Sequence, residues 1–376
     1  MTLRVGIDAR LIDWPGIGRY IELLLTGLRS RPDVEIVAYV EAGQVAALPP
    51  GTAHQVVSSG PFSIREQLAW PRIVRRDRLD VFHSPHFNIP VRVPVPVIAT
   101  VHDAAPLRYP PEGLFAFPRR LYAGLIYRLV AARASRVITG SAFARDDLTK
   151  LTPIPAAVVR VIHHGLHPNF VERAARKVTA ASPAAPPYVL YVGTNKPWKN
   201  LAVGLRGAAL AAARMPGLRF VIAGKQASNQ DSLGDLVRSV GGGLAIEVTG
   251  TVSDERLITL YQGATAVLCP SLYEGFGLTG LEAMACGVPV VHSGRASLQE
   301  VLGEAGMIAS AESPEEWAKA ITAIAREPRL RQDLVERGWA RAGEFTLAKM
   351  VDATVRVYEE TFKLGDAAAR RVKAAR

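Results

Sequence analysis

The fold is decided by residues 266–291, which read AVLCPSLYEGFGLTGLEAMACGVPVV. An apolar strand over Ala266–Cys269 precedes a glycine-bearing loop, a short helix and a second apolar strand over Val288–Val291. Strand, loop, helix and strand form a βαβ unit, and such a unit requires a parallel sheet. Parallel sheets bind ligands at the carboxyl ends of their strands, next to the first turn of the following helix.

Two carboxylates, Glu274 and Glu282, stand in this unit with seven residues between them. The Gly275-Phe276-Gly277 turn that separates them exposes backbone N–H groups to an anion at the start of the helix. Glu282 falls within the helix, on a face that reaches a sugar hydroxyl, whereas Glu274 stays in the loop. The stretch therefore predicts a site for a phosphorylated, hydroxyl-rich ligand.

The composition is that of an ordinary globular protein, with 49% apolar and 21% charged residues in a chain of 376. This length predicts two domains, or three. The sequence has no run of 18 or more apolar residues, so no membrane-spanning helix is expected. The N-terminus opens into a strand and lacks the charged and then apolar layout of a signal peptide. The two cysteines, Cys269 and Cys286, make neither a disulfide framework nor a zinc site, so we expect a reducing, cytoplasmic location.

The net charge of +11 indicates an anionic partner such as a nucleotide or phospholipid, or a charge that serves solubility alone. No recognition motif accompanies it, so nucleic-acid binding is not expected. The first 170 residues hold 20 Lys and Arg and 13 Asp and Glu. Within them, an expected helix over Phe117–Arg136 interleaves arginines with aromatic residues. Such a helix binds the inner face of a membrane peripherally, or packs one face on the sheet and extends its arginines to water.

Two features follow strands in the first half of the chain. After the strand at residues 3–8, Gly16 and Gly18 place backbone amides at the N-terminus of a helix that begins near Arg19. A third glycine is missing, with Ile21 in its place, so a plain turn is the alternative to a phosphate contact. The strand at residues 94–101 ends in His102, which either donates a hydrogen bond to a ligand oxygen or caps the strand structurally.

Residues 171–187 are rich in Ala, Pro and Ser and predict a linker. A strand over Tyr188–Val192 follows, and then a loop in which Lys196 and Lys199 precede a helix at residues 201–214. Cations beside a helix N-terminus suit a diphosphate. The alternation of strands and helices in both halves predicts an α/β protein with two facing Rossmann-like domains and a cleft between them.

Other helices are expected from apolar periodicity. A basic amphipathic helix at residues 63–78 is expected to be broken by Pro71. The last segment is expected to be helical over residues 314–327, 328–341 and 347–362, with a frayed end at residues 365–376.

In these motifs the chain resembles the retaining glycosyltransferases of family 4, which have the two-domain GT-B fold. The most specific match is EGFGLTGLE at residues 274–282, the family's pair of glutamates. Supporting matches follow in order: GIGRY at 16–20, TVHD at 100–103, VGT at 192–194 with KN at 199–200, and GTVSDERL at 250–257 with LY at 260–261. The resemblance covers nearly the whole chain and is nearest to the bacterial mannosyltransferase and polysaccharide-assembly branch.

The resemblance implies a role for each matched position. The expected catalytic residues are His102 beside the transferred sugar, Glu274 on its hydroxyls and Lys199 on the diphosphate. Gly16 would offer its amide to the distal phosphate, Glu282 would hold the ribose, and Val252 would face the base. The full expected donor-binding set is Gly16, Thr194, Lys196, Lys199, Val252, Glu274, Phe276, Gly277, Leu278 and Glu282.

Two positions depart from the family pattern. Trp198 and Thr194 stand where members frequently have arginine, and Lys196 is the candidate to supply the missing charge. The implied organisation is an acceptor domain over residues 1–170, the linker at 171–187, a donor domain over 188–345, and a terminal helix at 346–376 that crosses back to the N-terminal domain.

The implied chemistry is metal-independent and needs no cofactor, because the sequence has no Asp-x-Asp motif and Lys199 with the loop amides faces the departing diphosphate. Retention normally suggests a carboxylate nucleophile. If Glu274 holds hydroxyls instead, the acceptor attacks on the leaving-group face and the diphosphate takes its proton.

The donor expected from the resemblance is GDP-mannose, with a UDP-sugar as the alternative, and the acceptor is a glycan or lipid-linked glycan. Two other enzymes on the same fold remain open, a nucleotide-sugar epimerase and a phosphorylase. A third alternative is a non-catalytic protein that binds a sugar nucleotide or a glycan.

Overall fold

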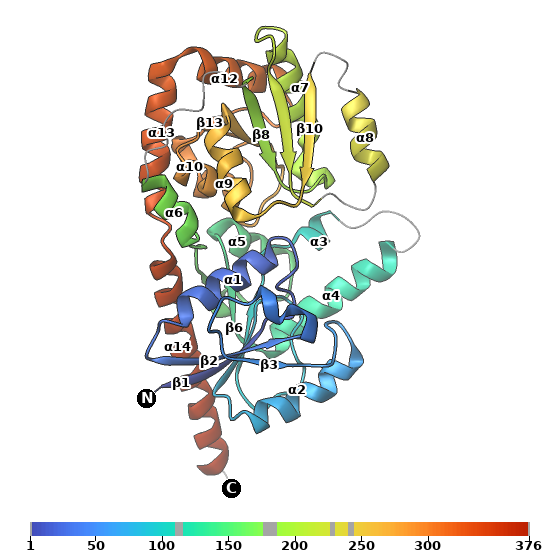
Figure 1. Cartoon of the computed structure of the whole chain (residues 1–376). Helices are drawn as coiled ribbons and strands as arrows, with labels where there is room; N and C mark the ends of the chain where they lie inside the picture. The colour runs from blue at the N-terminus through green and yellow to red at the C-terminus, as the bar shows by residue number, and fades with distance from the viewer. Residues whose placement is uncertain (1, 110–115, 176–185, 226–229, 240–243, 375–376) are drawn as a thin grey trace. The chain divides into compact units, whose positions relative to one another are not determined.

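The computed structural model describes residues 2–109, 116–175, 186–225, 230–239 and 244–374. The chain divides into two compact units (Figure 1). Unit 1 comprises Met1–Gly165 together with Leu347–Arg376, and unit 2 comprises Leu166–Thr346. Each unit is built on its own parallel sheet.

Unit 1 holds a seven-stranded sheet in the order β3-β2-β1-β4-β5-β6-β7, and all neighbours are parallel. The strand order reverses between β1 and β4, which is the topological switch point where open α/β sheets bind ligands. The strands are β1 (Leu3–Asp8), β2 (Val34–Val40), β3 (His54–Val56), β4 (Val81–Ser84), β5 (Val97–Thr100), β6 (Ala134–Thr139) and β7 (Val159–Val161).

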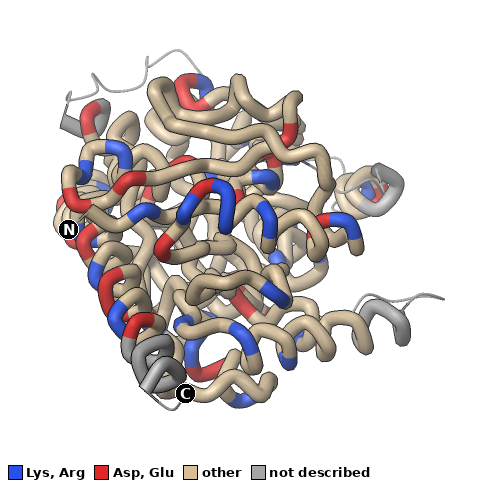
Figure 2. The backbone as a smooth tube through the Cα atoms, turned by 90° about the horizontal axis from the view of Figure 1, so that it is seen from below, with Lys and Arg blue, Asp and Glu red and all other residues tan. Residues whose placement is uncertain are grey.

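The helices of unit 1 include one from the far end of the sequence. They are α1 (Ile17–Leu28), α2 (Ile64–Arg76), α3 (Ala105–Arg108), α4 (Ala116–Arg133), α5 (Ala142–Leu151) and α14 (Leu347–Ala374). The last of these packs on α1 and on strands β1, β4, β5 and β6. Basic and acidic residues alternate along the part of the chain that leads to the C-terminus (Figure 2).

Unit 2 holds a six-stranded parallel sheet in the order β10-β9-β8-β11-β12-β13. Its switch point lies between β8 and β11. The strands are β8 (Tyr188–Val192), β9 (Arg219–Ala223), β10 (Ala245–Gly250), β11 (Ala266–Cys269), β12 (Val290–His292) and β13 (Met307–Ile308). The helices are α6 (Pro168–Ala175), α7 (Leu201–Ala212), α8 (Gln230–Ser239), α9 (Asp254–Gly263), α10 (Leu278–Ala285), α11 (Ser297–Val301), α12 (Pro314–Arg326) and α13 (Pro328–Gly343).

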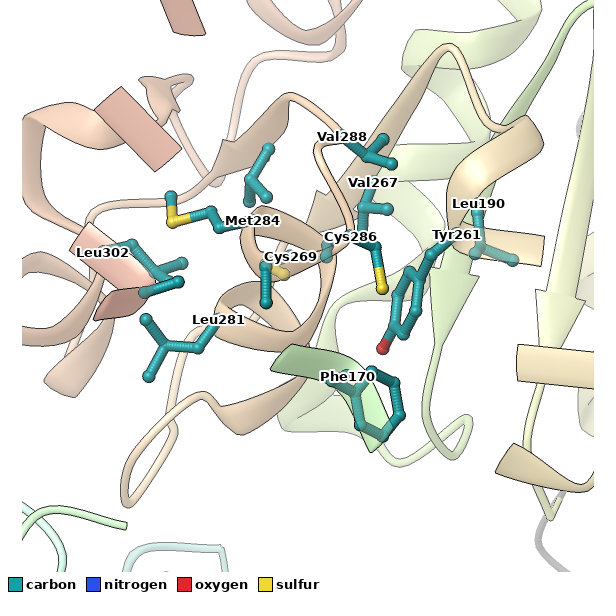
Figure 3. Packing of buried hydrophobic residues seen from close by; sticks show 14 of the residues in the cluster. Phe170, Leu190, Tyr261, Val267, Cys269, Leu281, Met284, Cys286, Val288 and Leu302 are labelled. Atoms are coloured by element: carbon teal, nitrogen blue, oxygen red, sulfur yellow. The ribbon is translucent and has the colours of Figure 1, made fainter. Parts of the chain in front are cut away.

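The core of unit 2 explains why its central strands read as continuous apolar runs. Successive side chains of β8, and likewise of β11, point to opposite faces of the sheet and enter two different buried clusters. Both faces are apolar because helices cover both. One cluster contains both cysteines, and Figure 3 shows Cys286 beside Tyr261 and Phe170. Burial raises the pKa of each thiol to about 12, so both cysteines serve as small apolar core residues.

The pattern of two parallel α/β sheets is confirmed, while several element boundaries were wrong. Helix α2 continues through Pro71 instead of breaking there, because buried Trp70 and Val74 anchor the turns on both sides of it. The strand expected from Val288 begins at Val290, since Pro289 has no N–H to give to the sheet. Helix α14 continues to Ala374, well beyond the expected end at Phe362.

The prediction of a linker over residues 171–187 was wrong in part. Helix α6 occupies residues 168–175, and its Phe170 is buried in unit 2. The first five residues of the expected linker, 171–175, therefore belong to a helix that Phe170 anchors in the core of unit 2. Most of the expected linker, residues 176–185, lies outside the described part of the chain.

Candidate functional site

The site in unit 2 is built by two loops that leave neighbouring strands at the switch point. The loop after β8 carries Lys199, and the loop after β11 carries Glu274. Their side chains form an ion pair, with Lys199 Nζ 2.6 Å from Glu274 Oε1. Both side chains are partly exposed, at 25% and 18%. The ion pair therefore remains open to a ligand from solvent.

Two serines that the sequence did not single out hold Glu274 in place. The Ser271 hydroxyl donates to Glu274 Oε1 at 2.8 Å. The buried Ser297 hydroxyl lies 2.8 Å from the carbonyl oxygen of Glu274 and 2.9 Å from that of Phe276. Glu274 Oε1 thus accepts hydrogen bonds from an ammonium and a hydroxyl, which fix its rotamer before any ligand arrives.

The loop after β8 is fixed by three further hydrogen bonds. Asn200 adopts a left-handed conformation, with φ of 52°, and its amide donates to the carbonyl oxygens of Pro270 and Ala311. The backbone N–H of Leu272 donates to the Trp198 carbonyl at 2.8 Å. These contacts join the Lys199 loop directly to the Glu274 loop, so the two charges are positioned as one group.

Gly277 allows α10 to start close to this ion pair. It is the N-cap of α10 and has φ of 104°, a conformation that favours glycine. A Cβ at this position would lie 2.8 Å from the Leu298 side chain. The first N–H groups of α10, beginning at Leu278, lack partners within the helix and form the positive end of its dipole. This end of α10 is suited to an anion.

Glu282 lies deeper than Glu274. Its side chain is in the middle of α10, and the residue is only 4% exposed. The hydroxyl of Tyr261, which is fully buried in α9, donates to Glu282 Oε2 at 3.0 Å. Burial raises the pKa of Tyr261 well above its usual value, so the phenol stays protonated and remains a donor.

The remaining expected donor-binding residues of unit 2 surround these loops. The Thr194 carbonyl accepts a hydrogen bond from the Tyr191 hydroxyl at 2.6 Å. The exposed Lys196 places its ammonium 5.0 Å from the centre of the Trp198 ring, an arrangement typical of a cation–π contact. Val252 is partly buried against the core, and Phe276 is buried edge-on to Phe345.

Gly16 and His102 belong to unit 1, at the carboxyl ends of β1 and β5. Gly16 is the exposed N-cap of α1, and its φ of 81° again favours glycine. His102 Nε2 lies 3.0 Å from the Pro85 carbonyl oxygen and therefore donates its proton there. Burial lowers the pKa of His102 to about 4, so the ring is neutral at pH 7. Its Nδ1 is then an acceptor, which differs from the donor role expected from the sequence.

Behind His102 lies a buried hydrogen-bond network that links four elements. His83 of β4 lies 2.8 Å from the Tyr358 hydroxyl of α14 through Nδ1, and 2.8 Å from the Thr100 hydroxyl of β5 through Nε2. The Tyr20 hydroxyl of α1 lies 3.1 Å from the same Thr100 hydroxyl. The Tyr20 ring stands edge-on to His102 at 4.9 Å. This network orients His102 through its neighbours.

The structure thus brings Lys199 and Glu274 together. It places Glu282 beyond the first turn of α10, buried beside Tyr261. Sequence reasoning missed Ser271, Ser297 and Tyr261. Tyr261 is part of a family match, but no contact with Glu282 was predicted from it. A serine that holds a loop in place cannot be told from an exposed serine by sequence alone. Within the described ranges, no three His, Cys, Asp or Glu side chains cluster as a metal site would require. No helix in those ranges is long and apolar enough to cross a membrane.

Comparison with known proteins gives the same class as this geometry. Residues 14–170 match the family described as Glycosyltransferase Family 4, and residues 173–341 match Glycosyl transferases group 1. The O-antigen chain mannosyltransferase B of Escherichia coli is 30% identical over 298 residues, which are 76% of this chain and 75% of that protein.

Solved structures share the fold at low sequence identity. Sucrose-phosphate synthase from Thermosynechococcus elongatus has a TM-score of 0.77 at 19% identity, covering 97% of this chain and 100% of that one. Anabaena HepE in complex with UDP-glucose has a TM-score of 0.72 at 16% identity, covering 95% and 99%. The two Rossmann-type sheets have the GT-B fold, and the family matches with the 30% identical relative identify a nucleotide-sugar-dependent glycosyltransferase. The chain belongs to glycosyltransferase family 4, whose members are retaining enzymes.

Proposed function

We propose that this protein transfers mannose from GDP-mannose to a hydroxyl of a glycan or lipid-linked glycan, without a metal ion. The observation that carries the proposal is the ion pair between Lys199 and Glu274 at the N-terminus of α10. In unit 2, Lys199 and the α10 amides would bind the diphosphate, Glu282 the ribose and Val252 the base. Residues 1–170 would form the acceptor domain and residues 188–345 the donor domain.

The chemistry follows from where charge develops. The bond between the anomeric carbon and the diphosphate oxygen breaks, so negative charge grows on the diphosphate while the sugar becomes positive. A fixed ammonium and helix N–H groups stabilise that negative charge without reorganising. In the proposed reaction, the Lys199 ammonium keeps its bond to Glu274 Oε1 and directs its other N–H groups to the phosphates, while Glu274 Oε2 accepts hydrogen bonds from sugar hydroxyls.

The hydrogen bonds on Glu274 favour this role over that of a nucleophile. Its Oε1 accepts from Ser271 and from Lys199, which lowers the electron density available for attack on carbon. We therefore propose front-face attack, in which the acceptor oxygen approaches beside the leaving diphosphate and gives it the proton. Trapping a sugar covalently on Glu274 in the wild-type protein would contradict this mechanism.

His102 is proposed to contact the transferred sugar as an acceptor. Its N–H is engaged with Pro85, so Nδ1 can accept a hydrogen bond from a hydroxyl of the sugar. Because the pKa is about 4, this role is kept throughout the neutral pH range. His102 would orient the sugar and would not act as a general acid.

The mannosyltransferase relative supports mannose as the sugar. A UDP-sugar is the second candidate, because a structural neighbour has been solved with UDP-glucose. A thermal-shift panel of GDP-mannose, GDP-glucose, UDP-glucose and UDP-GlcNAc separates the two. The correct donor at 100 times its dissociation constant should add about 2.7 kcal/mol to the free energy of unfolding. No shift with any donor would contradict the proposed function.

We also propose peripheral contact with the inner face of a membrane through unit 1. On α4, Leu121 and Leu125 are 63% and 52% exposed, while Ile64 and Leu68 on α2 are 85% and 68% exposed. Arginines flank them on both helices, and the side chains of residues 116–120 lie outside the described part. Co-sedimentation with anionic vesicles, compared with neutral vesicles, tests this contact.

A further inference from the structure

Three aromatic rings that have no assigned role gather at the switch point of unit 1. Trp14 follows β1, Phe62 follows β3, and His86 follows β4. The ring centres of Trp14 and Phe62 are 5.9 Å apart, and those of Phe62 and His86 are 5.5 Å apart with the planes almost perpendicular. Trp14 and His86 are 6.5 Å apart. Because the strands are parallel, all three loops leave the same edge of the sheet.

The rings of Trp14 and Phe62 are partly exposed to solvent. Trp14 is 47% exposed and Phe62 is 36% exposed, although both contact other aromatic rings. Phe62 also has φ of 63°, a left-handed conformation that is strained for a residue with a side chain. Strain of this kind persists only where the surrounding structure imposes it, and it gathers at functional sites.

His86 adds a hydrogen-bond donor beside these rings. The residue is only 7% exposed, and burial lowers its pKa to about 3, so the ring is neutral. Nδ1 accepts the backbone N–H of Asn88 at 3.2 Å, and the proton therefore sits on Nε2. No described residue accepts a hydrogen bond from that Nε2–H. This N–H is not fully enclosed by protein atoms, so a ligand oxygen can accept its hydrogen bond.

The segment that carries His86 is held by hydrogen bonds on both sides and lies next to His102. The Asn88 amide donates to Glu66 at 2.9 Å, and Glu66 is itself paired with the buried Arg10 at 2.6 Å. The carbonyl of Pro85, one residue before His86, is the acceptor of His102 Nε2–H. His86 therefore adjoins the histidine that is proposed to contact the transferred sugar.

We propose that Trp14, Phe62 and His86 form a subsite for a pyranose ring of the acceptor glycan. This inference rests on the proposed function, since it names the chemistry of the acceptor. A pyranose has an apolar C–H face that packs on an aromatic ring and hydroxyl oxygens that accept a hydrogen bond. The exposed rings match the first property, and the Nε2–H of His86 matches the second. An acyl chain would leave that donor unsatisfied, and a phosphate would require a cation where the imidazole is neutral.

Saturation-transfer NMR with methyl α-mannopyranoside, methyl α-glucopyranoside and α-mannobiose tests the subsite without donor or turnover. We expect at least one glycoside to bind, and Trp14→Ala to weaken its binding about tenfold. The matched control is Trp339→Ala, which removes a tryptophan of 43% exposure from unit 2 and should leave glycoside binding unchanged. His86→Phe keeps a ring and removes the donor, and should also weaken binding about tenfold.

The acceptor kinetics provide a second readout. If transfer is observed, Trp14→Ala should raise the KM for the acceptor about tenfold and change the KM for the donor less than twofold. The subsite is overturned if no glycoside binds, if Trp14→Ala and Trp339→Ala bind glycoside equally, or if Trp14→Ala loses vesicle binding but keeps glycoside binding. Glycoside binding that depends on Trp14, without transfer from any nucleotide sugar, would contradict the proposed function alone.

Discussion

At the residue scale, the ion pair between Lys199 and Glu274 is the centre of the proposed donor site. Three hydrogen-bonded groups, the ammonium, the carboxylate and the Ser271 hydroxyl, come from two loops that meet only in the fold. Lys196, the other cation of the motif, is exposed and contacts Trp198 instead. The two lysines of one short loop are therefore expected to differ in function.

Replacing Lys199 by alanine should lower kcat/KM for the nucleotide sugar about 100-fold or more, because it removes a fixed cation from the departing diphosphate. Lys196→Ala should cost less than tenfold, and Lys319→Ala, on the exposed face of α12, should match the wild type. Steady-state rates of nucleoside diphosphate release measure all three. Equal losses of kcat/KM in Lys196→Ala and Lys199→Ala would show that the rate depends on positive charge in this loop and not on the ion pair with Glu274.

The buried contact between Tyr261 and Glu282 allows a second test at this scale. Tyr261→Phe removes a hydrogen bond to a buried carboxylate and should cost about 1.5–3 kcal/mol of unfolding free energy. Tyr188→Phe removes a neutral hydrogen bond to the Leu260 carbonyl and should cost only about 1 kcal/mol. Urea denaturation of both variants gives the comparison. A smaller cost for Tyr261→Phe than for Tyr188→Phe would mean that Glu282 does not depend on the phenol.

At the element scale, α14 is held to unit 1 by side chains far apart in sequence. Glu360 pairs with Arg136 and Arg160 at 2.6 Å each, and Asp352 pairs with Arg31 at 2.6 Å. The hydrogen bonds from Arg136 and then Arg160 lower the pKa of Glu360 to about 2. The stabilisation is therefore present above the ordinary pKa of about 4.5 and is lost as the pH falls toward 2.

Glu360→Gln should speed amide exchange in α14 several-fold at pH 7 and cost no more than about 1 kcal/mol, because the carboxylate is 37% exposed and screened. The neighbouring Glu359 is exposed, so Glu359→Gln is the matched control. Hydrogen-exchange mass spectrometry of peptides within residues 347–366 provides the measurement. Identical exchange in the two variants would mean that α14 is held by its apolar face alone.

Elements with a glycine at a defined backbone position could be predicted from sequence, and elements fixed by distant contacts could not. The loop before α10 was recognisable because Gly277 needs a left-handed φ and opens a helix between two apolar strands. The same reasoning predicted Lys199 and Glu274 as site residues, and the structure brings the two side chains together. Ser297 could not be predicted, since its hydroxyl acts across 21 and 23 residues of sequence. The course of α2 through Pro71 likewise depends on tertiary burial of Trp70.

At the scale of the whole molecule, buried histidines should make stability depend on pH. Burial lowers the pKa of His83 and His86 to about 3 and that of His102 to about 4, from 6.5. Between pH 6.5 and about 4, the unfolded chain binds more protons than the native chain, so the free energy of unfolding falls as the pH falls. Each histidine contributes about 2 kcal/mol of this loss at pH 5.

The pH dependence can be assigned with one buried and one exposed histidine. His83→Gln should make the loss of stability between pH 7 and pH 5 shallower, although it lowers stability at pH 7. His54→Gln, at an exposed position in β3, should leave the slope unchanged. Thermal unfolding followed at half-unit steps of pH measures the slope. A wild-type Tm that stays constant from pH 7 to pH 5 would contradict neutral buried histidines.

The central claim is that the fixed pair of Lys199 and Glu274 supports metal-independent transfer from a nucleotide sugar. The most direct measurement is the rate of glycoside formation by the wild-type protein with GDP-mannose and α-mannobiose, with UDP-sugars in parallel, in the presence of EDTA. We predict product from one donor class, at a rate that EDTA does not change. Absence of product from every donor, or loss of product on adding EDTA that added Mg²⁺ restores, would contradict the account.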